Sequence, residues 1–112
     1  MQKVVKANEV KEEDFGAIKV RNIFHPQNLE TVSVAIIRIE GINRRHKNDK
    51  SDSFFYVIGG TGSYTIGNEV REVSSGDSIF IPKGMDYVDS GQMQVLAVSF
   101  PAYDETQIHY LE

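Results

Sequence analysis

The chain of 112 residues contains no cysteine and no tryptophan, and it has only three leucines beside twelve valines and eleven isoleucines. Without cysteine there is no disulfide, no thiolate metal site and no cysteine nucleophile. β-Branched side chains fit a pleated surface better than a helix, so the shortage of leucine disfavours a helical bundle. The composition therefore predicts an all-β protein.

Long apolar runs are also missing, so the sequence offers neither a transmembrane segment nor the apolar core of a signal peptide. Twelve basic residues against sixteen acidic ones give a net charge of −4, which disfavours a dedicated nucleic-acid-binding surface. From these absences we expect a cytoplasmic protein that binds neither membranes nor nucleic acids.

What the sequence does contain is a series of β-like runs separated by turn signals about every 8–12 residues, the spacing of a β-sandwich or barrel. Residues 31–41 read TVSVAIIRIEG and predict a largely buried strand. Gly67-Asn68 predicts a tight hairpin. The polar segment 43–53, NRRHKNDKSDS, is expected to connect two strands. We predict a single domain over residues 1–112, with an N-terminal arm at 1–16, a barrel at 17–100 and a tail at 101–112.

Two stretches resemble the paired motifs of the cupin superfamily. In the first stretch, Gly41 precedes His46-Lys47-Asn48, and Ser53 and Gly60 follow at the family's spacing. In the second, the segment GDSIFIPKG at residues 76–84 precedes Tyr87, and the glycines and the proline of the segment stand at the positions the family uses. The resemblance implies an all-β jelly-roll barrel, a double-stranded β-helix, and a homodimer.

The same resemblance locates the positions that hold a divalent metal in metal-binding cupins. Those positions carry His46, Asn48, Ser53 and Tyr87 in this chain, so one of four keeps a metal-ligand side chain. A neutral amide and a hydroxyl are poor ligands for the metals that imidazole and carboxylate bind. We therefore expect no metal cofactor, and the alternative is a divalent metal ion with His46 among its ligands.

Without the family pattern, the same residues still predict a polar cluster. His46 and Asn48 are two residues apart and share one face if the segment is extended. With Ser53 and Tyr87 they would form either a small-molecule site or an internal hydrogen-bond network around water. The apolar walls of such an interior are expected to include Phe55, Val57 and Phe80.

Arg44 and Arg45 immediately precede His46. A guanidinium suits phosphate and carboxylate groups, so this pair could attract an anion to the barrel mouth, although an ordinary solvated loop is the favoured explanation of the charges. We predict metal-free binding of a small polar or anionic molecule, such as a sugar, a sugar phosphate or a carboxylate, by Arg44, Arg45 and the four cluster residues. The alternatives are a metal-dependent isomerase, epimerase or dioxygenase centred on His46, and a structural dimeric barrel without a ligand.

Overall fold

The computed structural model describes residues 4–25 and 29–111 and confirms the all-β prediction. Its strands form one antiparallel sheet in the order β1-β2-β3-β7-β4-β5, in which β6 also pairs with β4 and β8 also pairs with β3. Two short 3-10 turns, η1 and η2, complete the described elements. The bounds are η1 Ala7–Glu9, β1 Glu13–Asp14, β2 Ile18–Phe24, β3 Ser33–Asn48, β4 Asp52–Ile66, β5 Glu69–Ser74, β6 Ser78–Ile81, β7 Tyr87–Phe100, η2 Glu105–Gln107 and β8 Ile108–Tyr110.

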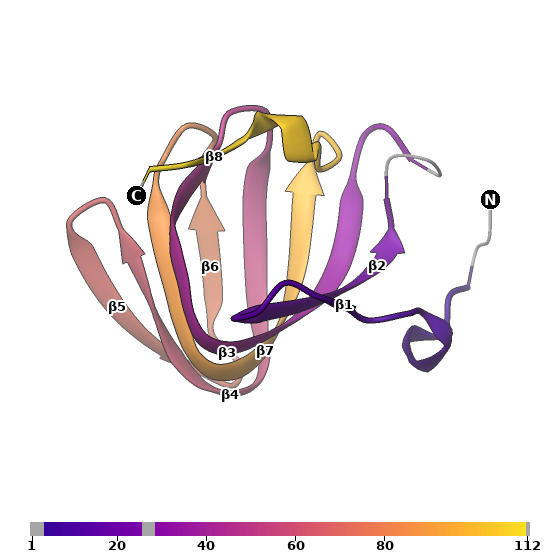
Figure 1. The fold of residues 1–112 in the computed structure, drawn as a ribbon, viewed down its shortest axis with the longest axis horizontal. Coiled ribbons are helices and arrows are strands. Elements are labelled where there is room, and N and C mark those ends of the chain that lie inside the picture. The colour runs from indigo at the N-terminus through magenta and orange to yellow at the C-terminus, as the bar shows by residue number, and fades with distance from the viewer. Residues whose placement is uncertain (1–3, 26–28, 112) are drawn as a thin grey trace.

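Three long strands, β3, β4 and β7, bend sharply so that the sheet folds back on itself (Figure 1). Gly41, Gly91 and Gly62 lie opposite one another across these strands and form a glycine row. A Cβ atom on Gly91 would lie 2.5 Å from the Cα of Gly62, and the φ of Gly91 is +131°. The bend therefore requires backbones closer than side chains would allow.

The glycine row divides the barrel into two facing layers. Layer A contains β2, β6 and the parts of β3, β4 and β7 at residues 33–40, 52–58 and 93–100. Layer B contains β5, β8 and the remaining parts of the three long strands. Each fully buried large apolar side chain contributes about 1.5–3 kcal/mol of transfer free energy. The buried apolar side chains of layer A that face the interior are Ile39, Phe55, Val57, Ile79, Ile81, Met93, Val95 and Ala97.

The predicted hairpin at Gly67-Asn68 is confirmed, because β4 ends at Ile66 and β5 begins at Glu69. The polar segment after Ile42 is not simply a connection, since β3 continues to Asn48. The segment pairs with both β7 and β8, which supply its backbone hydrogen-bond partners. The polarity of the segment gave no sign of this pairing. The prediction that Phe80 lines the interior is wrong. Alternation along β6 places Ile79 inside and leaves Phe80 54% exposed.

The C-terminal segment crosses the end of the barrel opposite the glycine bend (Figure 1). Its strand β8 pairs with the last three residues of β3, from His46↔Tyr110 to Asn48↔Ile108. Backbone hydrogen bonds from Asp49 N to the Gln107 carbonyl and from Leu111 N to the Arg45 carbonyl secure both sides of this pairing. The residues predicted as a tail thus cover one mouth of the barrel. None of the helices in the described ranges is long and apolar enough to span a bilayer.

Candidate functional site

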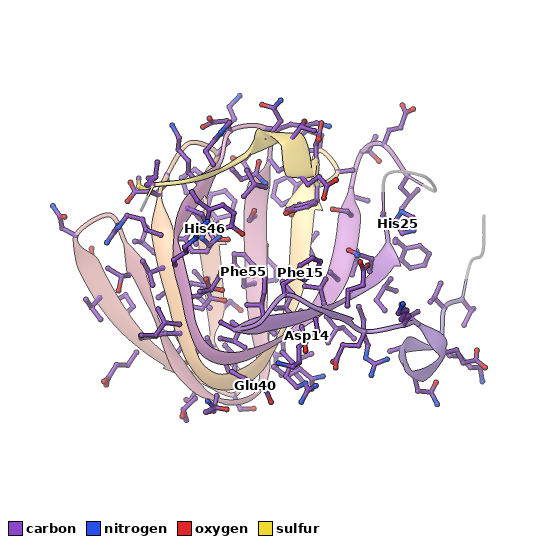
Figure 2. All side chains as sticks on the ribbon, viewed as in Figure 1. Asp14, Phe15, His25, Glu40, His46 and Phe55 are labelled. Atoms are coloured by element: carbon purple, nitrogen blue, oxygen red, sulfur yellow. The ribbon has the colours of Figure 1, made fainter. Side chains whose placement is uncertain are left out.

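His46 lies inside the barrel near the covered mouth, on the part of β3 that belongs to layer B (Figure 2). The side chain is buried, and its ring centroid lies 4.3 Å from that of Tyr87 on the neighbouring strand. Nδ1 is 2.7 Å from the Arg44 carbonyl oxygen. Because a carbonyl only accepts, Nδ1 must donate, and the neutral imidazole then presents Nε2 as an acceptor. The Nε2 atom of His46 is therefore the atom of the ring that can accept a hydrogen bond from a bound molecule.

Asp89 is the main member of the site that the sequence interpretation missed. It lies two residues after Tyr87 in β7, hence on the same face, and its carboxyl group accepts a 3.0 Å hydrogen bond from Asn43 Nδ2. Burial raises the pKa of Asp89 above its ordinary value, against the lowering effects of His46 and Asn43. The period-2 alternation from Tyr87 was the signal that could have identified it.

Tyr64 was also missed, although it lies opposite Asp89 across the β4–β7 pairing. Its side chain is completely buried, with ring centroids 5.5 Å from Phe55 and 6.2 Å from Tyr87. Within the described part of the chain, the Tyr64 hydroxyl is the buried side-chain polar atom without a hydrogen-bond partner in the protein. Burial, and secondarily the charge of Asp89, raises the pKa of Tyr64, so the phenol keeps its proton as a donor.

These side chains form what we call the interior cluster: His46, Tyr64, Tyr87 and Asp89. Burial likewise raises the pKa of Tyr87 well above its ordinary value. The cluster thus combines an imidazole acceptor, two neutral phenols and a carboxyl group whose pKa is raised. Such a set can hydrogen-bond hydroxyl and carbonyl groups and can move protons to or from a bound molecule.

The predicted residues Asn48 and Ser53 are both buried at the mouth end of the barrel. The side-chain oxygen of Asn48 accepts hydrogen bonds of 2.9 Å from the backbone N–H groups of Lys50 and Ser51, so it stabilises the turn into β4. Ser53 lies opposite Ile81 and Ser99 in layer A, across the interior from the strand part that carries His46. Asn48 thus lies two residues from His46 on β3, and Ser53 lies in the facing layer.

The predicted arginine pair does not join this cluster. The guanidinium of Arg44 lies 4.3 Å from the centroid of the Tyr110 ring, and the Tyr110 ring lies 5.6 Å from that of His46. Arg45 donates to Asp86 at 2.6 Å and to the Gly67 carbonyl at 3.3 Å. Arg44 thus packs on the Tyr110 ring, which in turn packs on His46. Arg45 connects β3 to the loop before β7 through its hydrogen bond to Asp86.

A hollow of about 440 Å³ lies at the side of the barrel, between the edge strands β5 and β6. We call it the lateral pocket. Tyr64 belongs to both the lateral pocket and the interior cluster. A larger hollow of about 630 Å³ follows the outside of the glycine bend, and no member of the interior cluster lines it. Of these two hollows, the lateral pocket is the one that adjoins the candidate site.

The residues around His46 do not fit a divalent metal. Across residues 4–25 and 29–111, no three His, Cys, Asp or Glu side chains converge in a way that could hold one. The side-chain oxygen of Asn48 already serves the turn at Lys50 and Ser51. Structural and catalytic sites for such metals use at least three imidazole, thiolate or carboxylate ligands, so His46 with Asp89 is too small a set.

The chain matches a protein-family model described as a cupin domain over residues 33–88. It is 27% identical over 101 residues to Uncharacterized protein MJ1618 of Methanocaldococcus jannaschii, a match that covers 83% of this chain and 81% of the relative.

Solved structures with the same fold include a variant of Streptomyces PAC13 with uridine. Its TM-score is 0.90 at 18% identity, and the match covers 100% of this chain and 92% of that one. Pac13 is described as a nucleoside dehydratase. The polyketide cyclase RemF from Streptomyces resistomycificus superposes with a TM-score of 0.83 at 18% identity, over 100% of this chain and 87% of its own. These structures show that the barrel architecture recurs in enzymes with different substrates.

Proposed function

This chain belongs to the cupin family, and we propose that it binds a small polar molecule inside the barrel without a metal ion. The observation that carries the proposal is the Tyr64 hydroxyl, which is buried without a protein partner beside Asp89. A buried, unsatisfied hydroxyl costs about 1–3 kcal/mol, so its retention calls for a specific reason. A bound molecule that accepts this hydrogen bond would supply that reason.

The composition of the interior also supports the proposal. Layer A presents apolar and aromatic side chains such as Phe55 and Ile79, and layer B presents the polar groups of the interior cluster. Small-molecule sites commonly combine mostly apolar walls with a few convergent polar groups. The Nε2 atom of His46 and the carboxyl group of Asp89 add an acceptor and a second donor to the phenol of Tyr64.

Uridine is a suitable first probe because a structural neighbour binds it and because it carries hydroxyl and carbonyl groups on a compact frame. We expect titration calorimetry of the metal-free protein to detect uridine binding. Y64F and D89N are each expected to weaken the binding by about tenfold, the equivalent of 1.4 kcal/mol. The matched control is Y56F, which removes the same hydroxyl from a tyrosine that is 41% exposed on the outer face of β4.

The control should bind as the wild type does. A requirement for added divalent metal, or equal losses in Y64F and Y56F, would contradict metal-free binding at the interior cluster. Absence of heat with uridine, and with a panel of neutral and phosphorylated nucleosides and sugars, would contradict the proposed function as a whole.

We further propose that two chains form a homodimer through the outer face of layer A. This face carries the exposed apolar side chains Tyr56, Phe80 and Phe100, and the Phe80 and Phe100 rings lie 6.4 Å apart across β4. A contiguous exposed apolar patch on a sheet is typical of a protein interface. A second copy would cover it with the same surface.

A further inference from the structure

Building on the proposed function, we infer that the ligand enters through the lateral pocket between β5 and β6 and that this pocket selects uncharged molecules over anionic ones. The sequence-based prediction had an anion attracted to the barrel mouth beside Arg44 and Arg45. Three features of the structure favour the lateral route: the closed mouth, the lining of the lateral pocket and the charge around it.

The first is the closure of the mouth above His46. Strand β8 pairs with the end of β3, and Tyr110 packs against the His46 ring under the Arg44 guanidinium. His109 Nε2 lies 3.3 Å from Asp49 Oδ2 beside this pairing. A molecule that entered here would have to displace a paired strand and an aromatic cover.

The second is the character of the lateral pocket. Ile66, Val73, Ile79 and Phe80 provide apolar and aromatic wall, and Tyr64 provides a buried ring that reaches the interior cluster. The volume of about 440 Å³ suits a molecule of the size of a nucleoside or a monosaccharide. The pocket opens between two strand edges that do not pair with each other, so no backbone ladder needs to break.

The third is the charge around the lateral pocket. Its charged lining residues are Arg71, Glu72 and Asp77, which sum to a negative charge. Arg71 also forms an ion pair with Glu69 of the same strand. A phosphate or carboxylate would meet carboxylates there that its own charge repels, whereas a neutral hydroxyl compound would not. The ligand class is therefore an uncharged polyhydroxyl or heterocyclic molecule.

The entry route is tested by methyl NMR with uridine as the probe. We expect uridine to shift the methyl signals of Val73 and Ile79 in the lateral pocket and to leave those of Ile108 and Leu111 at the mouth unchanged. In V73W the indole would fill the pocket, and the affinity should fall by about tenfold or more. V70W is the matched control on the outward face of the same strand, where Val70 is 62% exposed.

Shifts confined to the mouth methyl groups, or equal affinities of V73W and V70W for uridine, would overturn the lateral route and leave binding itself intact. Should V73W fail to fold, the methyl shifts of the wild type decide the question alone. Absence of any uridine binding together with the negative probe panel would instead contradict the proposed function, on which this inference rests.

The charge preference is tested by comparing uridine with uridine 5′-monophosphate. The wild type should bind uridine at least about tenfold more tightly, because the phosphate adds only repulsion at the rim. E72Q should reduce this ratio several-fold, whereas E105Q, which changes an exposed glutamate of η2, should not. Equal or tighter binding of the monophosphate, or a ratio that E72Q leaves unchanged, would overturn the preference for uncharged ligands.

Discussion

At the scale of single residues, Asp89 is the buried carboxyl group on which the chemistry of the interior depends. Its carboxyl group receives one hydrogen bond from Asn43, and burial disfavours its ionised form. The protonated acid can donate to a ligand, and the neighbouring imidazole of His46 can accept. The pair thus offers a ligand one donor and one acceptor side by side.

The raised pKa of Asp89 predicts how stability depends on pH. A folded-state pKa above the ordinary value of 3.8 means that the native protein retains a proton that the unfolded chain has lost. The free energy of unfolding should therefore fall as the pH rises from about 4 through the raised pKa. D89N cannot titrate, so its stability relative to the wild type should increase over that interval.

Urea denaturation of both proteins at a series of pH values, with the Asp89 carboxyl ¹³C shift as a direct titration signal, measures this effect. Parallel stability curves for D89N and the wild type, or an Asp89 carboxyl that titrates at or below 3.8, would show that burial does not control the group.

Sequence reasoning reached part of the site. The spacing of His46 and Tyr87 within the cupin-like motifs brought together two residues whose rings are in contact. It missed Asp89 and Tyr64, because neither occupies a motif position and their proximity arises from the β4–β7 pairing. It could not place Arg44 either, since the cation–π partner Tyr110 comes from a segment 66 positions away that only the fold brings close.

At the scale of elements, the glycine row allows three strands to serve both layers. The space around each glycine separates those that are required for close backbone approach from those that are required only for their dihedral angles. Gly91 would meet the Cα of Gly62 and the carbonyl oxygen of Thr61, each at 2.5 Å. Gly84, with φ of +81°, would meet nothing within 4 Å.

We therefore expect G91A and G84A to differ in cost. G91A combines an unfavourable dihedral angle with a backbone clash and should lower the free energy of unfolding by roughly 3–5 kcal/mol. G84A has the dihedral cost alone, about 1–2 kcal/mol. Urea denaturation provides the measurement, and similar losses in the two variants would mean that the strands at the bend can separate without penalty.

The element pattern was largely predictable from β-branched runs and turn residues. The unexpected length of β3 has a tertiary cause, because residues 43–48 are polar and gain their strand conformation from pairing with β7 and β8. Phe80 was misplaced for the opposite reason. The aromatic side chain suggested a core position, whereas the alternation set by buried Ile79 and Ile81 directs it outward.

At the scale of the whole molecule, the exposed apolar face of layer A predicts the assembly. Light scattering coupled to size exclusion should give a mass of twice the 12.6 kDa chain for the wild type. Y56E places a charge in the middle of that face and should yield a monomer, because an unpaired charge in an apolar interface is strongly disfavoured. V70E, at a site 62% exposed on layer B, is the control and should remain dimeric. A monomeric wild type would contradict the homodimer.

Apolar packing and polar recognition come from opposite layers of the barrel. The inward side of layer A is dominated by Ile, Val, Phe and Ala, whereas the polar and titratable members of the interior cluster all belong to layer B. Replacing His46 or Asp89 therefore changes recognition while the apolar wall is left intact, whereas Tyr64 and Tyr87 also belong to the buried apolar core. Such a separation makes the barrel readily evolvable. A mutational library restricted to Asn43, His46 and Asp89 should yield many folded variants with altered ligands, whereas an equal library on the facing wall should mostly lose the fold.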